Sequence, residues 1–162
     1  MIKKNISVII LSHKSKNLVL KLINKIYNKF PIIIIDNSND FELENNLKKN
    51  FSNIFFNIIE NNGYGAAINY ASKHVKTKYF LICNPDLDEL DEGKIDQFEE
   101  AAIKLNDKFS TLGPRYLNLN EKSIIQSDKN TNIAKMKFIS GACMFFKKET
   151  FDKIGGFDEN FF

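Results

Sequence analysis

Four short apolar runs, separated by segments with helical spacing, organise the first part of this sequence. Each run is dominated by isoleucine, valine, leucine and phenylalanine instead of alternating with polar residues, which predicts a strand buried on both faces. Strands of this kind that alternate with amphipathic helices build a parallel sheet covered on both sides. The predicted strands are Ile6–Leu11, Ile32–Ile35, Ile54–Ile59 and Tyr79–Cys83.

The segments between these runs have the periodicity of amphipathic helices. In the first segment, Leu18 is followed by apolar residues four, five and eight positions later, which predicts one apolar face made of Leu18, Leu22, Ile23 and Ile26. The predicted helices cover residues 17–30, 41–51, 65–75 and 94–105.

After Asp107 the pattern changes. Shorter strands are predicted over residues 110–119, 123–127 and 138–146, and the polar stretch 120–137 around the middle one predicts a mobile loop. A short helix over 147–154 and a turn over 155–162 follow. We therefore predict an α/β fold in a single domain, residues 1–162, with a regular half over 1–106 and a mixed half over 107–162.

Composition excludes several classes of protein. The net charge of +3 is too small, and the lysines are too scattered, for a nucleic-acid-binding surface. Cys83 and Cys143 lie in apolar runs, which predicts reduced core thiols in a cytoplasmic protein instead of a disulfide or zinc site. No stretch is apolar for long enough to span a membrane, although the many lysines permit peripheral association with its inner face.

Polar side chains follow each of the four predicted strands. Ligands of open parallel sheets bind outside the carboxyl ends of the strands, so these residues are the candidates for function. Three of the four ends carry a carboxylate, namely Asp36, Glu60 and Asp86. The residues are Ser12, His13 and Lys14; Asp36, Asn37 and Ser38; Glu60, Asn61, Asn62, Gly63, Tyr64 and Gly65; and Asn84, Pro85 and Asp86.

Two of these strand ends suit a nucleotide. Asp36 occupies the place where α/β nucleotide binders present an acid to a ribose or base, although an aspartate there is also common turn chemistry. Gly63 and Gly65 would let the backbone approach a phosphate, and the helix after them would offer its N–H groups. The segment is not a dinucleotide fingerprint, which belongs after the first strand, and there is no Walker lysine motif.

The fourth strand end suits a divalent cation. Mg²⁺ and Mn²⁺ prefer oxygen ligands and often take one or two carboxylates together with substrate phosphates. Pro85 fixes a turn that presents Asp86 at the sheet edge, where a cation could stabilise a departing nucleoside diphosphate. The alternative is a turn or helix-capping role, which we prefer for Asp88 and Glu89.

Five motifs in order along nearly the whole chain resemble those of the family 2 glycosyltransferases of GT-A fold, especially the rhamnosyltransferase-like branch. The resemblance implies the nucleotide-diphospho-sugar transferase fold and an inverting, metal-dependent transfer of a sugar to a glycan or lipid-linked acceptor, as in polysaccharide biosynthesis. The motifs are SVIILSHKS, IIIIDNSND, NNGYGAAIN, NPD and ISGACMFFKKETFDKIGGFDENFF.

The resemblance also implies roles for single residues. The donor, a dTDP-, UDP- or GDP-linked sugar, would bind residues 1–106, with its nucleoside on Ser12, His13 and Asp36. Asn69 would support that pocket, and Asp86 would bind the metal and the diphosphate. Gly141 and Asp158 would lie near the sugar and the acceptor, in an acceptor-side half over 107–162. The full donor set is Ser12, His13, Asp36, Gly63, Gly65, Asn69, Asn84 and Asp86.

This sequence departs from the family pattern in two places. The family usually has Thr-Tyr-Asn where this chain has Ser12-His13-Lys14, which leaves the preferred base open. The family's final segment leads into an acidic pair that supplies the general base, but this chain ends at Phe161 and Phe162. We therefore expect a truncated chain, or a fragment completed by another polypeptide, with Asp158 or Glu159 as a weak substitute for the base. A homo-oligomer is the other assembly that we consider.

Two other functions fit parts of this pattern. A non-catalytic nucleotide-sugar-binding module, or a degenerate transferase, would also bind the donor, and turnover with a supplied acceptor separates it from an enzyme. A sugar-1-phosphate nucleotidyltransferase would carry a loop rich in glycine and arginine after the first strand. The corresponding segment here, SHKSKN, has neither residue, so this alternative is disfavoured.

Overall fold

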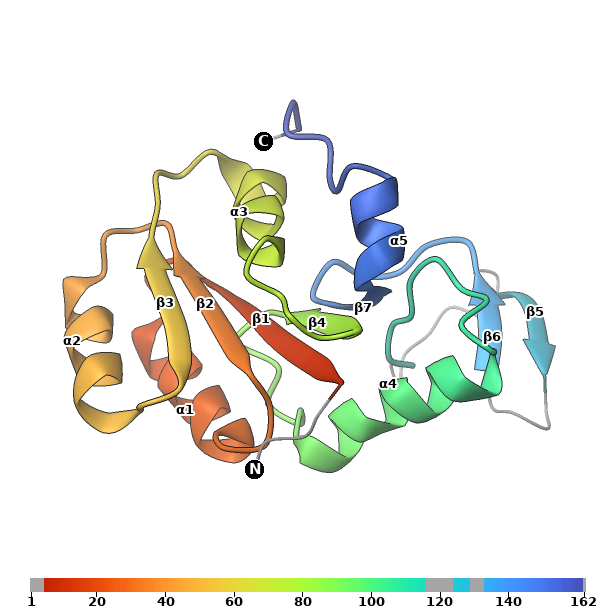
Figure 1. Ribbon diagram of the computed structural model, residues 1–162, viewed down its shortest axis with the longest axis horizontal. Helices are drawn as coiled ribbons and strands as arrows, with labels where there is room; N and C mark the ends of the chain where they lie inside the picture. Colours follow the sequence, from red (N-terminus) through yellow and green to blue (C-terminus); the bar gives the residue numbers. More distant parts are fainter. Residues whose placement is uncertain (1–4, 116–123, 129–132, 162) are drawn as a thin grey trace.

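The computed structural model describes residues 5–115, 124–128 and 133–161. Its centre is a five-stranded sheet in the order β3-β2-β1-β4-β7 (Figure 1). Strands β1 to β4 run parallel, and β7 runs antiparallel to β4, so the predicted α/β class with a mostly parallel sheet is confirmed. The strands of this sheet are β1 (Ile6–Ser12), β2 (Ile32–Asp36), β3 (Ile54–Ile58), β4 (Tyr79–Cys83) and β7 (Cys143–Lys147).

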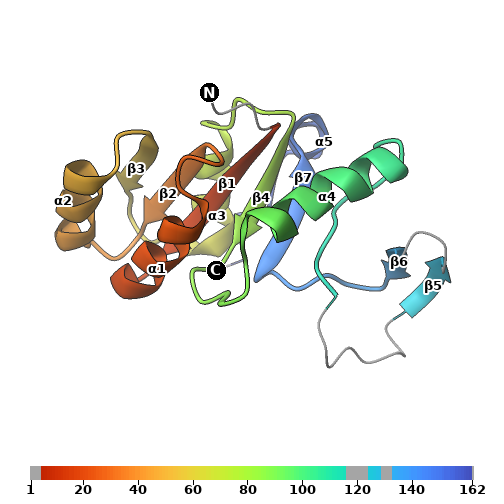
Figure 2. The same cartoon turned by 90° about the horizontal axis from the view of Figure 1, so that it is seen from below.

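Helices cover both faces of the sheet, which explains why the central strands are apolar throughout. Helices α1, α2 and α4 pack one face, and α3 with α5 packs the other (Figure 2). Strands β2 and β4 are therefore buried at every position, whereas the edge strand β3 is partly exposed. The helices are α1 (Lys16–Ile26), α2 (Phe41–Asn50), α3 (Gly63–Ser72), α4 (Glu92–Lys104) and α5 (Lys148–Lys153).

The buried face of α1 differs by one residue from the prediction. Leu22, Ile23 and Ile26 are buried as expected, but the fourth member is Val19, and Leu18 is 40% exposed. On a helix with 3.6 residues per turn, the apolar stripe is narrower when it is made of residues 19, 22, 23 and 26 than when Leu18 replaces Val19. The narrower stripe fits better against the sheet. The helix also ends at Ile26, four residues earlier than predicted.

The second half of the chain is less regular. Strands β5 (Ile124–Asp128) and β6 (Ile133–Met136) pair as a separate antiparallel hairpin. The strand predicted over 123–127 is confirmed by β5, whereas the prediction of a loop around it is wrong for the residues of β6. The rest of the predicted loop within 116–123 and 129–132 lies outside the described residues. The predicted strand over 138–146 is reduced to β7. Of the strand predicted over 110–119, residues 110–115 are described and form a single bridge, between Leu112 and Phe145, and residues 116–119 lie outside the described residues.

That bridge protects the outer edge of β7. The Leu112 N–H donates to the Phe145 carbonyl at 2.9 Å, and the Phe145 N–H donates to the Leu112 carbonyl at 2.8 Å. Within the described residues, the sheet therefore has an open edge at β3 and, at β7, an edge partly covered by the chain itself. Among the described residues, no helix has the length and apolar character needed to cross a membrane.

Candidate functional site

The strand order defines where a ligand would bind. From β1 the chain proceeds to β2 and β3 on one side, and it then returns to place β4 on the other side of β1. In open α/β sheets the ligand crevice lies outside the carboxyl ends of the two strands at which the order reverses. Here those strands are β1 and β4, followed by Ser12 and His13 and by Asn84, Pro85 and Asp86.

Asp36 lies beside this crevice, but its carboxylate is buried under the loop that follows. Its side chain is 0% exposed, and Ser12 is its register partner on β1. Oδ1 accepts the N–H groups of Ser38 at 2.9 Å and Asp40 at 3.0 Å, and Oδ2 accepts the Ser38 hydroxyl at 3.0 Å. Asp36 thus holds a tight turn before α2, and its contact with a donor nucleoside stays a prediction.

His13 begins a chain of hydrogen bonds across three strand ends. Its Nδ1 lies 2.9 Å from Asn37 Oδ1, and Asn37 Nδ2 donates to Asn61 Oδ1 at 3.0 Å. Asn61 Oδ1 also accepts the backbone N–H of Gly63 at 3.3 Å. The sequence placed Asn37 and Asn61 at strand ends without giving them a role. Ser12 is buried, with its hydroxyl 3.2 Å from that of Ser15.

The two glycines at the start of α3 have different physical roles. Gly63 has φ = 91°, a left-handed conformation that disfavours residues with a side chain. A Cβ on Gly65 would lie 3.1 Å from the Cβ of Phe157, so this glycine permits a close approach of the C-terminal segment. Their predicted role at a phosphate stays a prediction. Between them Tyr64 donates its hydroxyl to the Gly141 carbonyl at 2.8 Å, and burial raises the pKa of this phenol well above its usual value.

Asp86 is exposed at the end of β4. The N–H of Asn84 donates to the Ala142 carbonyl at 2.9 Å, which fixes the chain as it leaves the sheet beside the turn that contains Gly141. Across the described ranges, no cluster of three or more His, Cys, Asp or Glu side chains could hold a metal ion. A single exposed carboxylate nevertheless fits Mg²⁺ or Mn²⁺, because these ions can take most of their ligands from substrate phosphates and water.

The acids that follow Asp86 have structural partners. Asp88 forms an ion pair with Lys21 on α1 at 2.6 Å, and the hydrogen bond from Lys21 lowers the pKa of this carboxyl. Glu89 lies 3.3 Å from Lys94. Asp91 caps α4 by accepting the N–H of Lys94 at 2.9 Å. The preference for a structural role of Asp88 and Glu89 therefore agrees with their contacts.

Asn69 contacts the C-terminal segment. Its Oδ1 accepts the Phe157 N–H at 2.9 Å, and its Nδ2 donates to the Phe157 carbonyl at 2.9 Å and to Glu159 Oε1 at 2.8 Å. Gly156 has φ = 79°, and a Cβ there would lie 2.4 Å from Asn69 Oδ1. Asp158, in the same segment, is exposed, and its Oδ1 accepts the Asn160 N–H at 2.9 Å. The sequence motif alone did not reveal this link.

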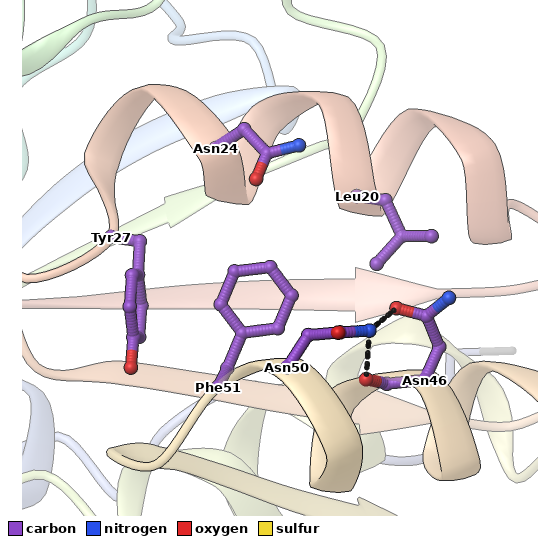
Figure 3. Close-up of a pocket in the computed structure, with 6 residues that line it drawn as sticks. All are labelled: Leu20, Asn24, Tyr27, Asn46, Asn50 and Phe51. Carbon is purple, nitrogen blue, oxygen red and sulfur yellow. Dashed lines mark hydrogen bonds between the residues drawn. The ribbon is translucent and has the colours of Figure 1, made fainter.

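Two cavities lie away from the crevice. Figure 3 shows a groove of about 380 Å³ between α1 and α2, where the rings of Tyr27 and Phe51 meet edge to face with centroids 4.7 Å apart. Its six lining residues carry no charge, so it offers no acid, base or metal ligand. A second cavity of about 240 Å³ lies along α3, and Tyr70, Lys73 and Glu159 are among its lining residues. The second cavity also includes Glu60 and Asn62, two of the candidate residues after β3, but neither cavity includes a residue of the predicted donor set.

Comparisons with known proteins agree with this architecture. The family model described as "Glycosyl transferase family 2" matches residues 7–155. A curated relative, the low-salt glycan biosynthesis hexosyltransferase Agl10 of Haloferax volcanii, is 25% identical over 183 aligned positions, which cover 98% of this chain and 57% of that protein. The chain therefore spans little more than half the length of this relative.

Solved structures show the same fold at low sequence identity. The mannosyltransferase PcManGT from Pyrobaculum calidifontis, solved with GDP-Man and Mn²⁺, is 16% identical with a TM-score of 0.72, covering 96% of this chain and 48% of that one. Residues 1–349 of TarS from S. aureus, solved with UDP, are 14% identical with a TM-score of 0.62, and the match covers 96% of this chain and 50% of that one. These likenesses show that the sheet and its helices have the GT-A architecture.

Proposed function

This chain belongs to glycosyl transferase family 2, and on that basis we propose that it transfers a sugar from a nucleoside-diphosphate sugar to a glycan or a lipid-linked acceptor. The proposed reaction inverts the anomeric carbon. The acceptor hydroxyl oxygen forms a bond to that carbon as the bond to the diphosphate oxygen breaks, and a base removes the hydroxyl proton. The same fold binds GDP-Man in PcManGT and UDP in TarS, which supports a nucleotide sugar as the donor.

The observation that carries this proposal is the exposed carboxylate of Asp86 at the strand-order reversal. It stands at the end of β4, across the predicted crevice from His13 at the end of β1. An acid that is exposed at this edge and makes no ion pair within the described residues is available for a ligand. Asp88, only two residues away, is instead paired with Lys21.

Asp86 would hold a divalent cation, and the residues around it would position the diphosphate. The cation would supply positive charge to the departing phosphate oxygens. The backbone N–H groups at the start of α3 would bind phosphate oxygens, because an α-helix leaves its first N–H groups without intrahelical partners. Gly63 allows the turn that brings this end of the helix to the crevice, and Asn84 fixes the chain immediately before Asp86.

The acceptor would approach from the side formed by Gly141 and the segment around Asp158. Tyr64 joins these parts, since its hydroxyl binds the Gly141 carbonyl and its ring meets that of Phe157 edge to face at 6.2 Å. We keep Asp158 as the candidate base; its side chain is exposed, as is that of Glu159, which accepts a hydrogen bond from Asn69. We assign residues 1–106 to donor binding and residues 107–162 to the acceptor side.

We also propose that the protein works in the cytoplasm, at the inner membrane face when its acceptor is lipid-linked. One observation supports this location: Cys83 and Cys143 are free thiols, as in proteins of reducing compartments. A second polypeptide, or a second copy of this chain, is proposed as a partner.

Thermal unfolding with nucleotide sugars tests the donor site. UDP, dTDP and GDP sugars are added singly, with and without Mg²⁺ or Mn²⁺, to the wild type and to Asp86→Asn. A donor at a hundred times its dissociation constant should add about 2.7 kcal/mol to the free energy of unfolding. This corresponds to a rise in Tm of about 5–10 °C for a domain of this size. We expect one donor to give a metal-dependent rise that Asp86→Asn removes.

A matched variant distinguishes the site from a general effect of negative charge. Asp88→Asn removes an exposed carboxylate two residues away, and it should leave the donor-induced rise in Tm unchanged. No rise with any donor, or an equal rise in Asp86→Asn, would contradict the proposed site. Release of the nucleoside diphosphate in the presence of an acceptor then separates a transferase from a module that only binds the donor.

A further inference from the structure

The three residues predicted to contact the donor nucleoside differ in accessibility. Ser12 and Asp36 are both 0% exposed, and their side-chain oxygens are engaged by neighbouring residues of the chain. His13 is exposed at the same edge. Of these three groups, the imidazole of His13 is therefore the one that a ligand reaches without opening a loop.

The hydrogen-bond chain that begins at His13 fixes which ring nitrogen carries the proton. The argument starts from the backbone N–H of Gly63, which can only donate, so the Asn61 atom 3.3 Å from it is the carbonyl oxygen Oδ1. The Asn37 atom 3.0 Å from that oxygen must then be the donor Nδ2. The remaining side-chain atom of Asn37 is its oxygen, 2.9 Å from His13 Nδ1, so Nδ1 carries a proton and donates it.

This series of hydrogen bonds leaves one hydrogen-bonding role for Nε2, the other ring nitrogen of His13. In a neutral imidazole with a proton on Nδ1, Nε2 has a lone pair and can only accept. Turning the ring over would place a carbon against Asn37 Oδ1 and break the bond. Asn37 is itself 9% exposed, and its amide is held at both ends, so it cannot turn to suit a different tautomer.

We propose that His13 determines the base specificity of the donor site, by accepting a ring N–H of the nucleobase at Nε2; this rests on the proposed function. Uracil, thymine and guanine carry such an N–H beside a carbonyl group. Cytosine and adenine present a lone pair at the corresponding ring nitrogen, which would face the lone pair of Nε2 across a desolvated contact.

The position of His13 supports this assignment. It follows β1, one of the two strands at which the strand order reverses, and Asp86 follows the other. A nucleotide whose diphosphate lies near Asp86 would extend toward the end of β1. Asn37 and Asn61 then act as positioning residues, because they reach the ligand only through the orientation and the proton of His13.

The first test measures the tautomer in the unaltered protein. NMR of isotope-labelled histidine distinguishes a protonated Nδ1 from a protonated Nε2, and His74 is the only other histidine in the chain. We expect the Nδ1–H form for His13 at a pH where the ring is neutral, and its loss in Asn37→Ala. A ring protonated on Nε2 in the wild type would overturn the inference without any ligand being needed.

The second test measures binding by calorimetry with UDP, dTDP, GDP, CDP and ADP in the presence of Mg²⁺. We expect the wild type to bind one or more of UDP, dTDP and GDP more tightly than CDP and ADP. His13→Asn keeps a donor near Asn37 but has no atom at the position of Nε2, and it should lose up to about tenfold in affinity for the preferred base only. His13→Gln introduces an amide that can present either its oxygen or its NH₂ group to the base. This variant should therefore bind both groups of bases more evenly.

His74→Asn is the matched control. The imidazole of His74 stacks on Phe55 with centroids 3.9 Å apart, beyond the end of α3, and this variant should leave all five affinities unchanged. Equal affinity for all bases in the wild type, or a preference that survives in His13→Asn, would overturn the role of His13 alone. Failure of all five nucleotides to bind would overturn the proposed donor site, and the role of His13 with it.

Discussion

The two halves of this protein achieve stability in different ways. In the first half, strands β1, β2 and β3 pair in sequence order, and each connecting helix packs on the strands beside it. In the second half, β7 pairs with β4 from the first half, and the C-terminal segment is held by Asn69 on α3. The first half therefore depends on patterns that recur locally, whereas the second half depends on single contacts between distant residues.

This difference bears on how the proposed site is assembled. The donor side lies on strand ends whose positions follow from the sheet itself. The acceptor side depends on three links to α3, which are the hydrogen bond from Tyr64 to Gly141, the contact of Gly65 with Phe157, and the amide of Asn69. A single helix thus supports both sides, and changes in it test whether the halves are coupled.

The largest effect is expected from Phe145→Ala on β7. Phe145 is fully buried, and its ring lies within 6.0 Å of the rings of Tyr79, Phe98 and Phe109. Truncation would leave a cavity among residues of both halves and cost about 3–5 kcal/mol in the free energy of unfolding, measured by urea denaturation.

Phe138→Ala is the control for that measurement. Phe138 is 68% exposed, so its truncation should change the free energy of unfolding by no more than about 0.5 kcal/mol. If Phe145→Ala cost as little as Phe138→Ala, β7 would not belong to the same cooperative unit as the parallel strands, and the two halves would unfold separately.

A smaller and local effect is expected from Asn69→Ala. This change removes the partner of both backbone polar groups of Phe157, at a cost of about 1–3 kcal/mol for the docking of the segment. Hydrogen exchange should therefore speed up at the Phe157 amide, while the amides of β1 and β2 keep their rates. Asn69→Asp keeps an acceptor for the Phe157 N–H but places a carboxylate oxygen against the Phe157 carbonyl and Glu159 Oε1, so its effect should be at least as large as that of Asn69→Ala. Faster exchange throughout the sheet would contradict a local role.

The smallest effect at neutral pH is expected from the thiols of Cys83 and Cys143, which face each other across β4 and β7. Burial raises the pKa of Cys83 well above its usual value and that of Cys143 to about 12. Below pH 9.0, the ordinary thiol value, both are protonated in the folded and unfolded states and contribute nothing. Above it the unfolded chain loses protons that the folded chain keeps, so stability falls as the pH rises toward 12.

Urea unfolding midpoints measured at pH values roughly one unit apart, from about 7.5 to about 10, would follow the onset of this fall in stability. Cys143→Ala removes one of the two thiols and should make the fall shallower. The thiols should also react slowly with alkylating reagents in the folded protein, because the thiolate is the reactive form. Rapid alkylation at neutral pH would indicate that β7 detaches from β4.

Much of the fold could be predicted from the sequence, because its signals are contiguous. The run Tyr79–Cys83 gave the bounds of β4 without error, and the other three parallel strands agree within one residue. Residues that follow these strands were placed together at one edge, since parallel strands end on the same side. A strand over 123–127 was predicted and corresponds to β5, but its partner β6 was missed because the polar stretch that contains it resembles a loop.

The sequence by itself determined the elements and the polar strand ends, since each depends on residues that are neighbours along the chain. Only the tertiary structure decided the partners of the asparagines. Asn37 connects His13 to Asn61, and Asn69 binds Phe157, 88 positions away. The physical reason is that an amide donates and accepts equally well, so its type does not select a partner. The path of the chain brings a particular partner within reach of each asparagine. The partners of Asn37 determine the inferred proton position on His13, and the partner of Asn69 determines the place of the C-terminal segment.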